Sequence, residues 1–337
     1  MRAYEFTNFG LENLGIVERD EPKPNANEVL LKIHAVSLNF RDLLFKNGLY
    51  NPRAKFPAVP IADAAGEVVE IGEGVTKWKV GDRVTNIYAP GWIDGELTAQ
   101  KNKVTYGDGA LEGVLTEYRT FDENTLVRIP EHLSYEEGST LPIAAVTAWN
   151  ALAVSGNLKA GETILTQGTG GVSIFAIQFA KLFGAKVIAT SSSDEKLVRA
   201  QELGADELIN YKKREDWDVA ARELTGKIGV DHVVEVGGIG TMSRSINAVR
   251  PGGHIAAIGI LTTAGDLNLV PILMKAVRIQ GIFVGSRTTF EQAYRAIEFA
   301  KLEPVIDKVF AFEEAREALE YMESGSHFGK VVVKVGE

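Results

Sequence analysis

The stretch Gly168-Thr169-Gly170-Gly171-Val172-Ser173 directly follows the apolar run Ile164-Leu165-Thr166 and directly precedes the helical pattern from Ile174 to Lys181. Glycines between a strand and a helix let the backbone approach a pyrophosphate without interference from Cβ atoms. The helix that follows offers unpaired N–H groups and the positive end of its dipole to the same phosphates. The order of strand, glycine turn and helix therefore predicts a dinucleotide site. The expected contacts are Gly168, Thr169, Gly170, Gly171 and Val172.

The flanks of the turn make this prediction specific, because a short glycine pattern alone is weak evidence. Ser173 occupies the third glycine position of the usual fingerprint. A purely structural glycine turn is the alternative interpretation.

The sequence pattern predicts a parallel sheet around this turn. From about Gly161, apolar runs alternate with glycine turns and with helical segments such as Lys196 to Leu203, which is typical of βαβ units. The expected strands are Thr163 to Thr166, Lys186 to Thr190, Glu207 to Ile209, His232 to Val236 and His254 to Ile258. The middle of the chain is therefore predicted to be a doubly wound α/β sheet.

The segments on either side of this sheet have a different pattern. The N-terminal part holds short alternating or β-branched runs interrupted by Gly and Pro, which predict an irregular, mainly β domain. The tail from Arg287 to Glu337 holds two helix-like segments and ends in the strand Lys330 to Val335. At 337 residues the chain exceeds the size of most single hydrophobic cores, so two domains are expected.

The strand after the glycine turn ends without a carboxylate. An acidic residue about 20 residues beyond the turn usually binds the ribose of NAD, but this chain has Thr190-Ser191-Ser192-Ser193 there. Hydroxyl groups do not repel a 2′-phosphate, so NADPH is expected in preference to NADH. The expected contacts are Ser191, Ser192, Lys196 and Tyr211. In the alternative interpretation, the serines only cap the helix that begins near Asp194, and the lysine is a solvated surface charge.

Composition and charge exclude several classes of function. A formal net charge of −9 without a Lys/Arg-rich run disfavours nucleic acid as a partner. The chain has no cysteine, which excludes disulfides, thiolate nucleophiles and every zinc site that requires sulfur. Because the sequence shows neither a leader pattern nor an apolar stretch of about 18 residues, we expect a cytoplasmic protein without a membrane partner.

Further segments recur together in one protein family, in the order seen here. They are Pro57-Ala58-Val59-Pro60, Ala65-Gly66-Glu67-Val68-Val69, Val80-Gly81-Asp82-Arg83-Val84, Val146-Thr147-Ala148-Trp149, Leu203-Gly204-Ala205-Asp206 and Arg250-Pro251-Gly252-Gly253. With the glycine turn, nearly the whole chain resembles the medium-chain dehydrogenase/reductase family. The resemblance implies a GroES-like, β-rich catalytic domain formed by residues 1–143 and 284–337. It also implies a Rossmann dinucleotide-binding domain formed by residues 144–283.

The zinc ligands of the metal-dependent members of this family are missing. Members similar to this chain carry a cysteine where Asn39 stands, a Gly-His-Glu run where Ile61-Ala62-Asp63 stands, and a cysteine or equivalent ligand near Ile143. The four cysteines of their structural zinc lobe have no counterpart between Ala89 and Gly113. The one remaining carboxylate cannot supply the three protein ligands of a catalytic zinc ion, so no metal site is expected.

Without a Lewis acid, conjugated acceptors are favoured over simple alcohol–aldehyde interconversion. Hydride addition to a quinone or enone gives a delocalised anion, which hydrogen-bond donors and water stabilise and protonate. The zinc-free branches of the family carry motifs like Asn39-Phe40-Arg41-Asp42 and Gly48-Leu49-Tyr50. The resemblance therefore implies an NADPH-dependent oxidoreductase similar to quinone oxidoreductases.

By the same resemblance, three residues would carry catalytic roles. Asn39 would contact the nicotinamide ribose or the substrate carbonyl, Asp42 would orient the loop, and Tyr50 would donate a hydrogen bond or proton to the product enolate. The alternatives are structural. Asn39 would cap the helix from Asp42 to Lys46, and Asp42 would cap that helix or pair with Arg41. Tyr50 would only line the site.

The resemblance implies further cofactor contacts. They are Thr147, Gly237, Gly259, Ile260, Phe283, Val284, Phe328 and Lys330. Thr147 would face the nicotinamide, the segment from Ile282 to Arg287 would pair with its carboxamide, and Phe328-Gly329-Lys330 would close over the cofactor. For the two glycines, an ordinary turn is the alternative.

Other functions stay open at this point. An enoyl-thioester (acrylyl-type) reductase requires no additional motif, an alcohol dehydrogenase is a third enzymatic possibility, and an NADPH-binding structural or sensor protein is the non-enzymatic one. The resemblance implies a homodimer or homotetramer, and the apolar runs Ile255 to Ile260 and Leu267 to Leu273 would suit an interface or a buried core. None of the five histidines stands close to another in the sequence, so they predict neither a metal site nor a relay.

Overall fold

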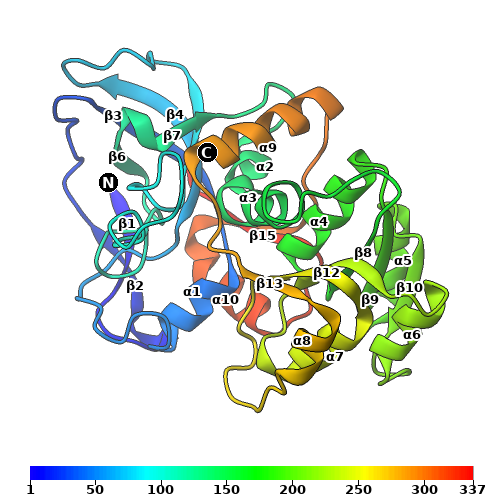
Figure 1. The fold of residues 1–337 in the computed structure, drawn as a ribbon. Coiled ribbons are helices and arrows are strands. Elements are labelled where there is room, and N and C mark those ends of the chain that lie inside the picture. The colour runs from blue at the N-terminus through cyan, green and yellow to red at the C-terminus, as the bar shows by residue number, and fades with distance from the viewer. Residues whose placement is uncertain (337) are drawn as a thin grey trace. The chain divides into compact units, whose positions relative to one another are not determined.

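The computed structural model describes residues 1–336, and its contacts divide the chain into two compact units (Figure 1). Unit 1 comprises residues 1–146 together with the chain from Gly285 onward, and unit 2 comprises Thr147–Val284. The sequence places the domain boundaries after residues 143 and 283, and the contacts place them after Val146 and Val284.

Unit 1 is built on a sheet in the order β14-β15-β3-β4-β5-β7, with β6 paired to β3 (Figure 1). Its strands are β3 Glu28–Ser37, β4 Asp63–Ile71, β5 Arg83–Asn86, β6 Tyr118–Asp122, β7 Leu126–Arg128, β14 Ile306–Phe310 and β15 Lys330–Lys334. A separate antiparallel pair joins β1 Arg2–Phe6 to β2 Leu14–Glu18. Strand β3 is central because its residues are mostly buried and it pairs with β4, β6 and β15.

Short helices complete unit 1. They are α1 Phe40–Lys46, α2 Tyr135–Ser139, α9 Arg287–Ala300 and α10 Ala315–Glu323, with 3₁₀ turns at Leu11–Asn13, Glu123–Thr125 and Phe312–Glu314. A helical segment with two π-type stretches, Leu141–Ala145 and Asn150–Val154, flanks α3 Val146–Trp149 at the boundary with unit 2. The apolar side chains of Phe290 and Ile297 in α9 are both buried.

Unit 2 contains a parallel sheet in the order β10-β9-β8-β11-β12-β13. Its strands are β8 Thr163–Gln167, β9 Lys186–Ser191, β10 Glu207–Asn210, β11 Val230–Glu235, β12 Val249–Ala257 and β13 Arg278–Gly281. The connecting helices are α4 Gly171–Leu182, α5 Asp194–Glu202, α6 Trp217–Leu224, α7 Ile239–Ala248 and α8 Val270–Lys275. Because the chain runs outward from β8 to β10 and then resumes at β11 on the other side, the strand order reverses between β8 and β11. The predicted doubly wound sheet is confirmed, and this order is the Rossmann one.

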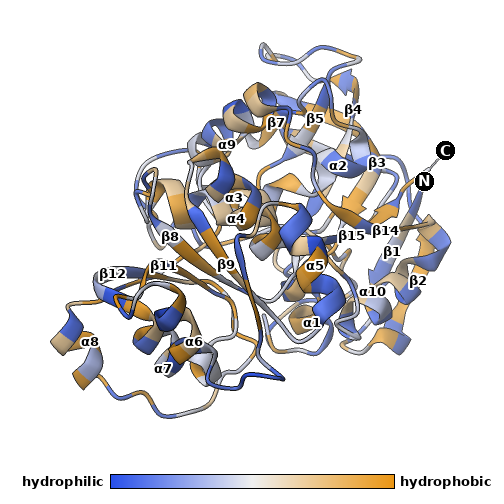
Figure 2. Cartoon of the chain, turned by 90° about the vertical axis from the view of Figure 1, so that its right-hand side faces the viewer, coloured by the Kyte–Doolittle hydropathy of each residue, from blue (hydrophilic) through white to orange (hydrophobic). Residues whose placement is uncertain are grey.

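The core of unit 2 follows from strands that are apolar over their whole length. Leu165, Ile188, Val233 and Ile255 come from four different strands and are fully buried in one cluster. Strands of parallel sheets are covered by helices on both faces, so they need continuous apolar runs. Figure 2 shows β8 and β9 mainly in the hydrophobic colour.

Strand β13 is the element of this sheet that the sequence did not predict. Its four residues, Arg278–Gly281, are all exposed, with an accessible fraction of 36% at Ile279. A short strand with two polar residues and a glycine has no clear periodicity, so it resembles a loop in sequence. The prediction of five strands was therefore one short, and β13 forms the edge of the sheet next to β12.

Two histidines that are far apart in the sequence lie side by side in the paired strands β11 and β12. His232 and His254 are partners in the register of these strands, and their Nδ1 atoms are 3.4 Å apart. His232 Nε2 is 3.0 Å from Glu162 Oε2, and His254 Nε2 is 3.2 Å from Ser155 Oγ. The sequence shows no close pair of histidines, and this contact arises because parallel pairing brings together positions 22 residues apart.

Among residues 1–336, no helix combines the length and the hydrophobicity that crossing a bilayer requires.

Candidate functional site

The glycine turn of unit 2 has an open outer face. Strand β8 ends at Gln167, Gly168 adopts a positive φ of 67°, and α4 begins at Gly171. A Cβ atom added to Gly168 would meet no protein atom within 4 Å. The hydroxyl of Ser173 donates to the carbonyl of Gln167 at 2.7 Å, so this serine ties the first turn of α4 to the end of the strand. The turn therefore leaves room for phosphate groups at the N-terminus of a twelve-residue helix.

A hydroxyl-rich turn joins β9 to α5, beside the end of β10. Ser191 is buried, and its carbonyl accepts from the backbone N–H of Tyr211 at 3.0 Å. Ser193 caps α5 by accepting from the backbone N–H of Lys196 at 3.4 Å. The carboxylate of Asp194, the first residue of α5, accepts from Asn210 Nδ2 at 2.6 Å and from the Lys213 ammonium. The sequence predicts that Tyr211 and the serines belong to one contact set. In the structure Tyr211 lies next to Ser191.

Gly237 follows the end of β11 and lies beside a buried polar network that sequence reasoning missed. Glu235 is completely buried, and its Oε1 accepts from the backbone N–H groups of Gly237 and Gly238 at 2.8 and 3.1 Å. Gln167 Nε2 donates to Glu235 Oε2 at 2.6 Å, which links this loop to the glycine turn of β8. The signal in the sequence was a lone glutamate at the end of an otherwise apolar strand.

Local backbone geometry constrains both Gly259 and Val284. A Cβ on Gly259 would lie 1.9 Å from the carbonyl oxygen of Val236, so packing alone requires glycine there. Val284 has a positive φ of 48°, and its carbonyl accepts from Asn150 Nδ2 at 2.7 Å. A β-branched residue in this left-handed region is strained by about 1–3 kcal/mol, and such strain clusters at ligand sites. Thr147, in the same unit, is buried in α3.

The remaining cofactor residues predicted in unit 2 differ in exposure. Thr169 is buried and Ile260 is half exposed. Whether they bind a cofactor stays a prediction, as it does for Phe283 and the rest of this set.

In unit 1, three adjacent strands bring Asn39, Asp63 and Lys330 together. Asp63 begins β4, Lys330 begins β15, and Asn39 follows the end of β3, the strand that lies between the other two. Asn39 Nδ2 donates to Asp63 Oδ2 at 2.9 Å, and Lys330 Nζ donates to Asn39 Oδ1 at 2.7 Å. Lys330 Nζ also donates to the Leu38 carbonyl at 2.6 Å. We call these three side chains the amide triad.

Burial governs the electrostatics of the amide triad. Asp63 and Lys330 are 0% and 3% exposed. Burial raises the pKa of Asp63 to about 7, against the opposing effects of the Lys330 charge and the Asn39 hydrogen bond. Burial likewise lowers the pKa of Lys330 to about 8, against the attraction of Asp63 and Asp42. Both groups are shifted toward their neutral forms.

Asp42 caps the helix that follows Asn39. Its Oδ2 accepts from the backbone N–H of Asn39 at 2.8 Å, and its Oδ1 lies 3.3 Å from Arg41 Nη1. Burial raises the pKa of Asp42, opposed by the Arg41 charge and the Asn39 N–H. The helix begins at Phe40, two residues earlier than the expected Asp42. Asp42 thus orients the loop that carries Asn39.

Tyr50 belongs to a second cluster, which sequence reasoning identified only in part. Its hydroxyl is hydrogen-bonded to that of Tyr88, a buried residue before the chain turns at Ala89. The Arg41 guanidinium carbon lies 4.5 Å from the centre of the Tyr50 ring and 5.4 Å from that of Tyr88. Burial raises the pKa of Tyr88, although the nearby Arg41 charge lowers it. We call Arg41, Tyr50 and Tyr88 the phenol cluster.

Phe328 and Lys330 are both buried in unit 1. The ammonium of Lys330 is directed to Leu38 and Asn39, an arrangement that the sequence did not predict. A direct cofactor contact by either residue stays a prediction.

The residues at the zinc positions of the family do not fit a zinc ion. Asp63 Oδ2 already accepts two N–H groups, from Asn39 Nδ2 and from the backbone of Ile143 at 3.2 Å. The Lys330 ammonium beside Asn39 would repel a cation, and Ile61 and Ala62 offer no ligand atom. In the part of the chain that the structure describes, no three His, Cys, Asp or Glu side chains are grouped to hold a metal ion.

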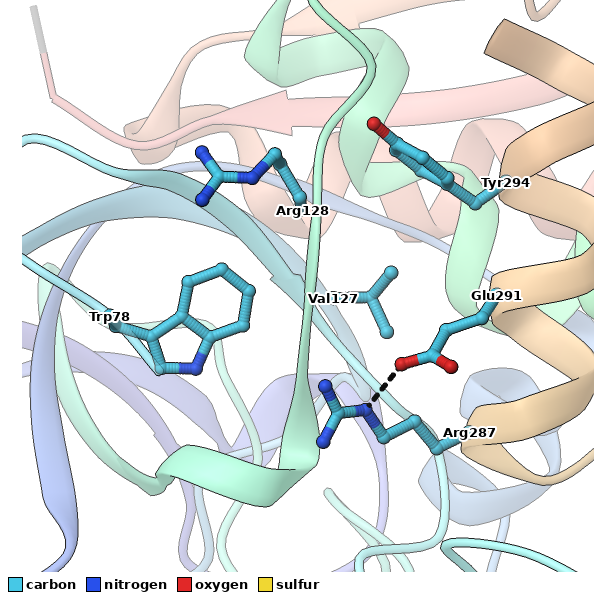
Figure 3. Close-up of a pocket in the computed structure, with 6 residues that line it drawn as sticks. All are labelled: Trp78, Val127, Arg128, Arg287, Glu291 and Tyr294. Atoms are coloured by element: carbon cyan, nitrogen blue, oxygen red, sulfur yellow. Dashed lines mark ion pairs between the residues drawn. The ribbon is translucent and has the colours of Figure 1, made fainter. Parts of the chain in front are cut away.

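A cavity of about 240 Å³ in unit 1 contains none of the predicted site residues (Figure 3). It is lined by Trp78, Val127, Arg128, Arg287, Glu291 and Tyr294. Both arginines have carboxylate partners, since Arg287 Nε lies 3.0 Å from Glu291 and Arg128 lies 3.3 Å from Asp82. With its charges paired internally, this cavity gives no indication of a ligand.

Two family models match the chain in the two units. The model described as "Alcohol dehydrogenase GroES-like domain" matches residues 25–131, and the model described as "Zinc-binding dehydrogenase" matches residues 171–299. The fold therefore defines a dehydrogenase-type oxidoreductase with a GroES-like domain and a Rossmann domain, as the sequence predicts.

Individual relatives extend this match over the whole chain. A zinc-type alcohol dehydrogenase-like protein of Schizosaccharomyces pombe is 42% identical, over 97% of this chain and 96% of the relative. An acryloyl-coenzyme A reductase of Metallosphaera sedula is 30% identical over 94% and 95%, and a quinone oxidoreductase of Sus scrofa is 30% identical over 93% and 90%. The chain belongs to the medium-chain dehydrogenase/reductase family.

Solved structures of oxidoreductases agree with the fold. An NAD-dependent alcohol dehydrogenase matches with a TM-score of 0.92 and 34% identity, over 100% of each chain. The quinone oxidoreductase of Escherichia coli complexed with NADPH matches with a TM-score of 0.83 and 25% identity, over 99% of this chain and 100% of the other.

Proposed function

We propose that this chain transfers hydride from NADPH to a conjugated carbonyl compound, a quinone or an enone, without a metal ion. One observation carries the proposal: an amide held by a carboxyl group and an ammonium occupies the zinc position, while a hydrogen-bonded pair of phenols supplies hydroxyl groups in the same unit. A simple ketone requires strong stabilisation of an alkoxide. A conjugated acceptor delocalises the charge, so hydrogen-bond donors suffice.

Tyr50 is the proposed proton donor of the reaction. Bound NADPH supplies the hydride. The hydroxyl of Tyr50 is held by that of Tyr88, and the Arg41 guanidinium lies over both rings. Tyr88 is a positioning residue in this scheme, since it is buried and bonds to the donor. Asn39 is the proposed contact for the substrate carbonyl or the nicotinamide ribose.

The preference for NADPH rests on the turn between β9 and α5. The strand ends in serines, and the nearby Asp194 carboxylate is already engaged by Asn210 and Lys213. A 2′-phosphate at this point would therefore meet hydroxyl groups and no free carboxylate from Asp194. One solved neighbour is named NAD-dependent and another contains NADPH, so neighbours alone do not choose between the cofactors.

Enoyl thioesters and alcohols are the two alternative substrate classes. An enoyl thioester is also a conjugated carbonyl, and a relative is named acryloyl-coenzyme A reductase. Alcohol dehydrogenation is the alternative that relatives' names suggest, but the amide triad offers it no Lewis acid. A protein that binds NADPH without catalysis is the non-enzymatic alternative, and the phenol cluster argues against it.

We further propose a homodimer or homotetramer. Strand β13 is an exposed edge, and the adjoining segments carry an apolar patch formed by Ile260, Leu261, Leu269, Val270, Leu273 and Met274, each at least half exposed. Exposed apolar patches and unpaired sheet edges are typical of subunit interfaces. The run from Leu267 to Leu273, which the sequence left open as interface or core, includes the two most exposed leucines of the patch.

The test is a panel of substrates in which the absorbance of the nicotinamide cofactor reports the rate of its oxidation or reduction. NADPH or NADH is offered with quinones, enones, enoyl thioesters and aldehydes, and the oxidised cofactors are offered with alcohols. Oxidation of NADPH by the conjugated acceptors, with slower oxidation of NADH, supports the proposal. Turnover confined to alcohols and aldehydes would contradict it, and binding of NADPH without any turnover would favour the non-enzymatic role.

A further inference from the structure

The side-chain amide of Asn39 has one chemically acceptable orientation. Its Oδ1 accepts from the Lys330 ammonium at 2.7 Å, and its Nδ2 donates to the Asp63 carboxyl at 2.9 Å. Rotating the amide by half a turn would place its oxygen against the carboxyl oxygen and its NH₂ group against the ammonium. Both contacts would be repulsive, so the two neighbours determine which way the amide faces.

The backbone around the amide is as well determined as the side chain. Ser37, the last residue of β3, pairs with Asp63 on one side and with Val332 of β15 on the other. The Leu38 carbonyl accepts a second hydrogen bond from the Lys330 ammonium, which restrains that group directly beside Asn39. Three strands of one sheet therefore set the positions of all three side chains.

Fold stability gives no account of this arrangement. Asp63 and Lys330 are both buried, yet within residues 1–336 neither has an oppositely charged group within 4.0 Å. The neutral amide lies between them. Burial of separated charges is costly, and apolar residues of similar volume usually stabilise a fold at least as well. A role in holding the Asn39 amide would explain why Asp63 and Lys330 are buried despite this cost.

We propose that Lys330 and Asp63 are positioning residues that hold the Asn39 amide in one orientation for the substrate or cofactor group that it contacts. The inference rests on the proposed function, and it goes further by giving both residues a role that acts through Asn39 alone. It differs from the sequence-based expectation that Lys330 binds the cofactor directly, which stays a separate prediction. Lys330 holds the oxygen end of the amide and Asp63 holds its nitrogen end. Loss of either neighbour therefore frees the amide to rotate.

A kinetic experiment tests whether Lys330 acts through Asn39. Lys330→Met is made in the wild-type background and in an Asn39→Ala background, and single-turnover hydride transfer and NADPH affinity are measured for each. We expect a rate lower by about 10- to 100-fold in the wild-type background, no further loss in Asn39→Ala, and an NADPH affinity no weaker than that of Asn39→Ala. Lys330→Arg should restore most of the rate, because it keeps the charge and the N–H donors.

Two outcomes would contradict the proposal, and one variant serves as the control. An equal loss of rate in both backgrounds, or an NADPH affinity of Lys330→Met weaker than that of Asn39→Ala, would overturn the proposal. The matched control is Lys46→Met, which removes another buried lysine of unit 1 whose ammonium pairs with Glu323 at 2.7 Å. That variant should keep the wild-type rate, and a comparable loss there would show that buried lysines matter only for folding.

A second readout is independent of turnover. In protein labelled with ¹⁵N-asparagine, the two Nδ2 protons of Asn39 should give separate, exchange-protected signals, assigned by their loss in Asn39→Ala. We expect Lys330→Met to remove this protection and Lys46→Met to retain it. If the wild type reduces no conjugated acceptor, the proposed function fails, and these signals still decide the positioning role. Unchanged Asn39 signals in Lys330→Met would refute it.

Discussion

At Asn39, the backbone and the side chain have separate tasks. The backbone N–H donates to Asp42 and begins helix α1, while the side chain turns to Asp63 and Lys330. The sequence offered capping and function as alternatives for this residue. In the structure Asn39 is the N-cap residue of α1 and forms a capping box with Asp42, and its amide also contacts Asp63 and Lys330, so capping and the role proposed above do not exclude each other.

The first prediction concerns the hydroxyl of Tyr50. Tyr50→Phe removes the proposed proton donor, so kcat with a conjugated acceptor should fall by about 100-fold, while NADPH affinity stays unchanged. The control is Tyr294→Phe, which removes a hydroxyl bound to Glu298 at 2.7 Å in another part of unit 1. Steady-state kinetics of both variants decide the question. Wild-type turnover by Tyr50→Phe would exclude this residue from proton transfer.

Some residues of the site were beyond the reach of the sequence for a physical reason. Tyr88 lies 38 positions from Tyr50, and Lys330 lies 291 positions from Asn39, so no local periodicity connects them. A sequence motif relates residues that are close together in the chain, whereas these contacts arise from the folding of distant segments. One signal was present: Lys330 opens a strand that continues with three valines, and a lysine that enters such a buried strand requires a polar partner.

Among the elements, the turn between β9 and α5 carries the cofactor preference. The second prediction is that Ser192→Asp weakens NADPH binding by at least about 10-fold relative to NADH, because a carboxylate repels the 2′-phosphate. Ser192→Asn has a similar shape without the charge and should keep the preference of the wild type. Affinities of both cofactors are measured by fluorescence titration. Equal weakening of both by Ser192→Asp would mean that the turn does not contact the 2′-phosphate.

The strands of unit 2 show how far patterns determine elements. Apolar runs between glycine turns predicted β8 to β12, because buried parallel strands need continuous hydrophobic residues. The start of β12 was missed by five residues, since Pro251, Gly252 and Gly253 resemble a turn yet belong to the strand from Val249. The exposed β13 has no such run. The strands with buried residues were thus predictable, whereas the fully exposed β13 was not.

For the whole molecule, the buried pair of histidines couples stability to pH. Burial, with the charges of His232 and Arg278, lowers the pKa of His254 to about 4 from an ordinary 6.5. Between these values the unfolded chain binds more protons than the folded one. Stability is therefore complete above about pH 6.5 and is lost as the pH falls toward 4.

The third prediction puts a magnitude on this effect. Urea unfolding should show a free energy of unfolding about 2 kcal/mol lower at about pH 5 than at about pH 7 from His254 alone. The variant His254→Gln should lose that part of the pH dependence, whereas His132→Gln should retain it. If the wild type and His254→Gln change equally between the two pH values, this histidine is not the titrating group.

The fourth prediction concerns assembly. Leu273 is 79% exposed in the apolar patch beside the edge strand β13, so Leu273→Asp should shift an oligomer toward monomer. Phe299→Asp is the matched control, because Phe299 is 93% exposed on α9, outside the patch. Light scattering after gel filtration gives the masses. An unchanged mass for Leu273→Asp, or dissociation by the control, would show that the patch is not the interface.

Hydride transfer without a metal ion is the central claim, and chelation tests it most directly. The rate of NADPH oxidation by a quinone or enone is measured before and after exhaustive treatment with EDTA, with zinc content determined on the same samples. We predict the same rate in both, because the amide triad and the phenol cluster supply the polar groups at the site. Loss of activity on chelation and its recovery with added zinc would contradict the account.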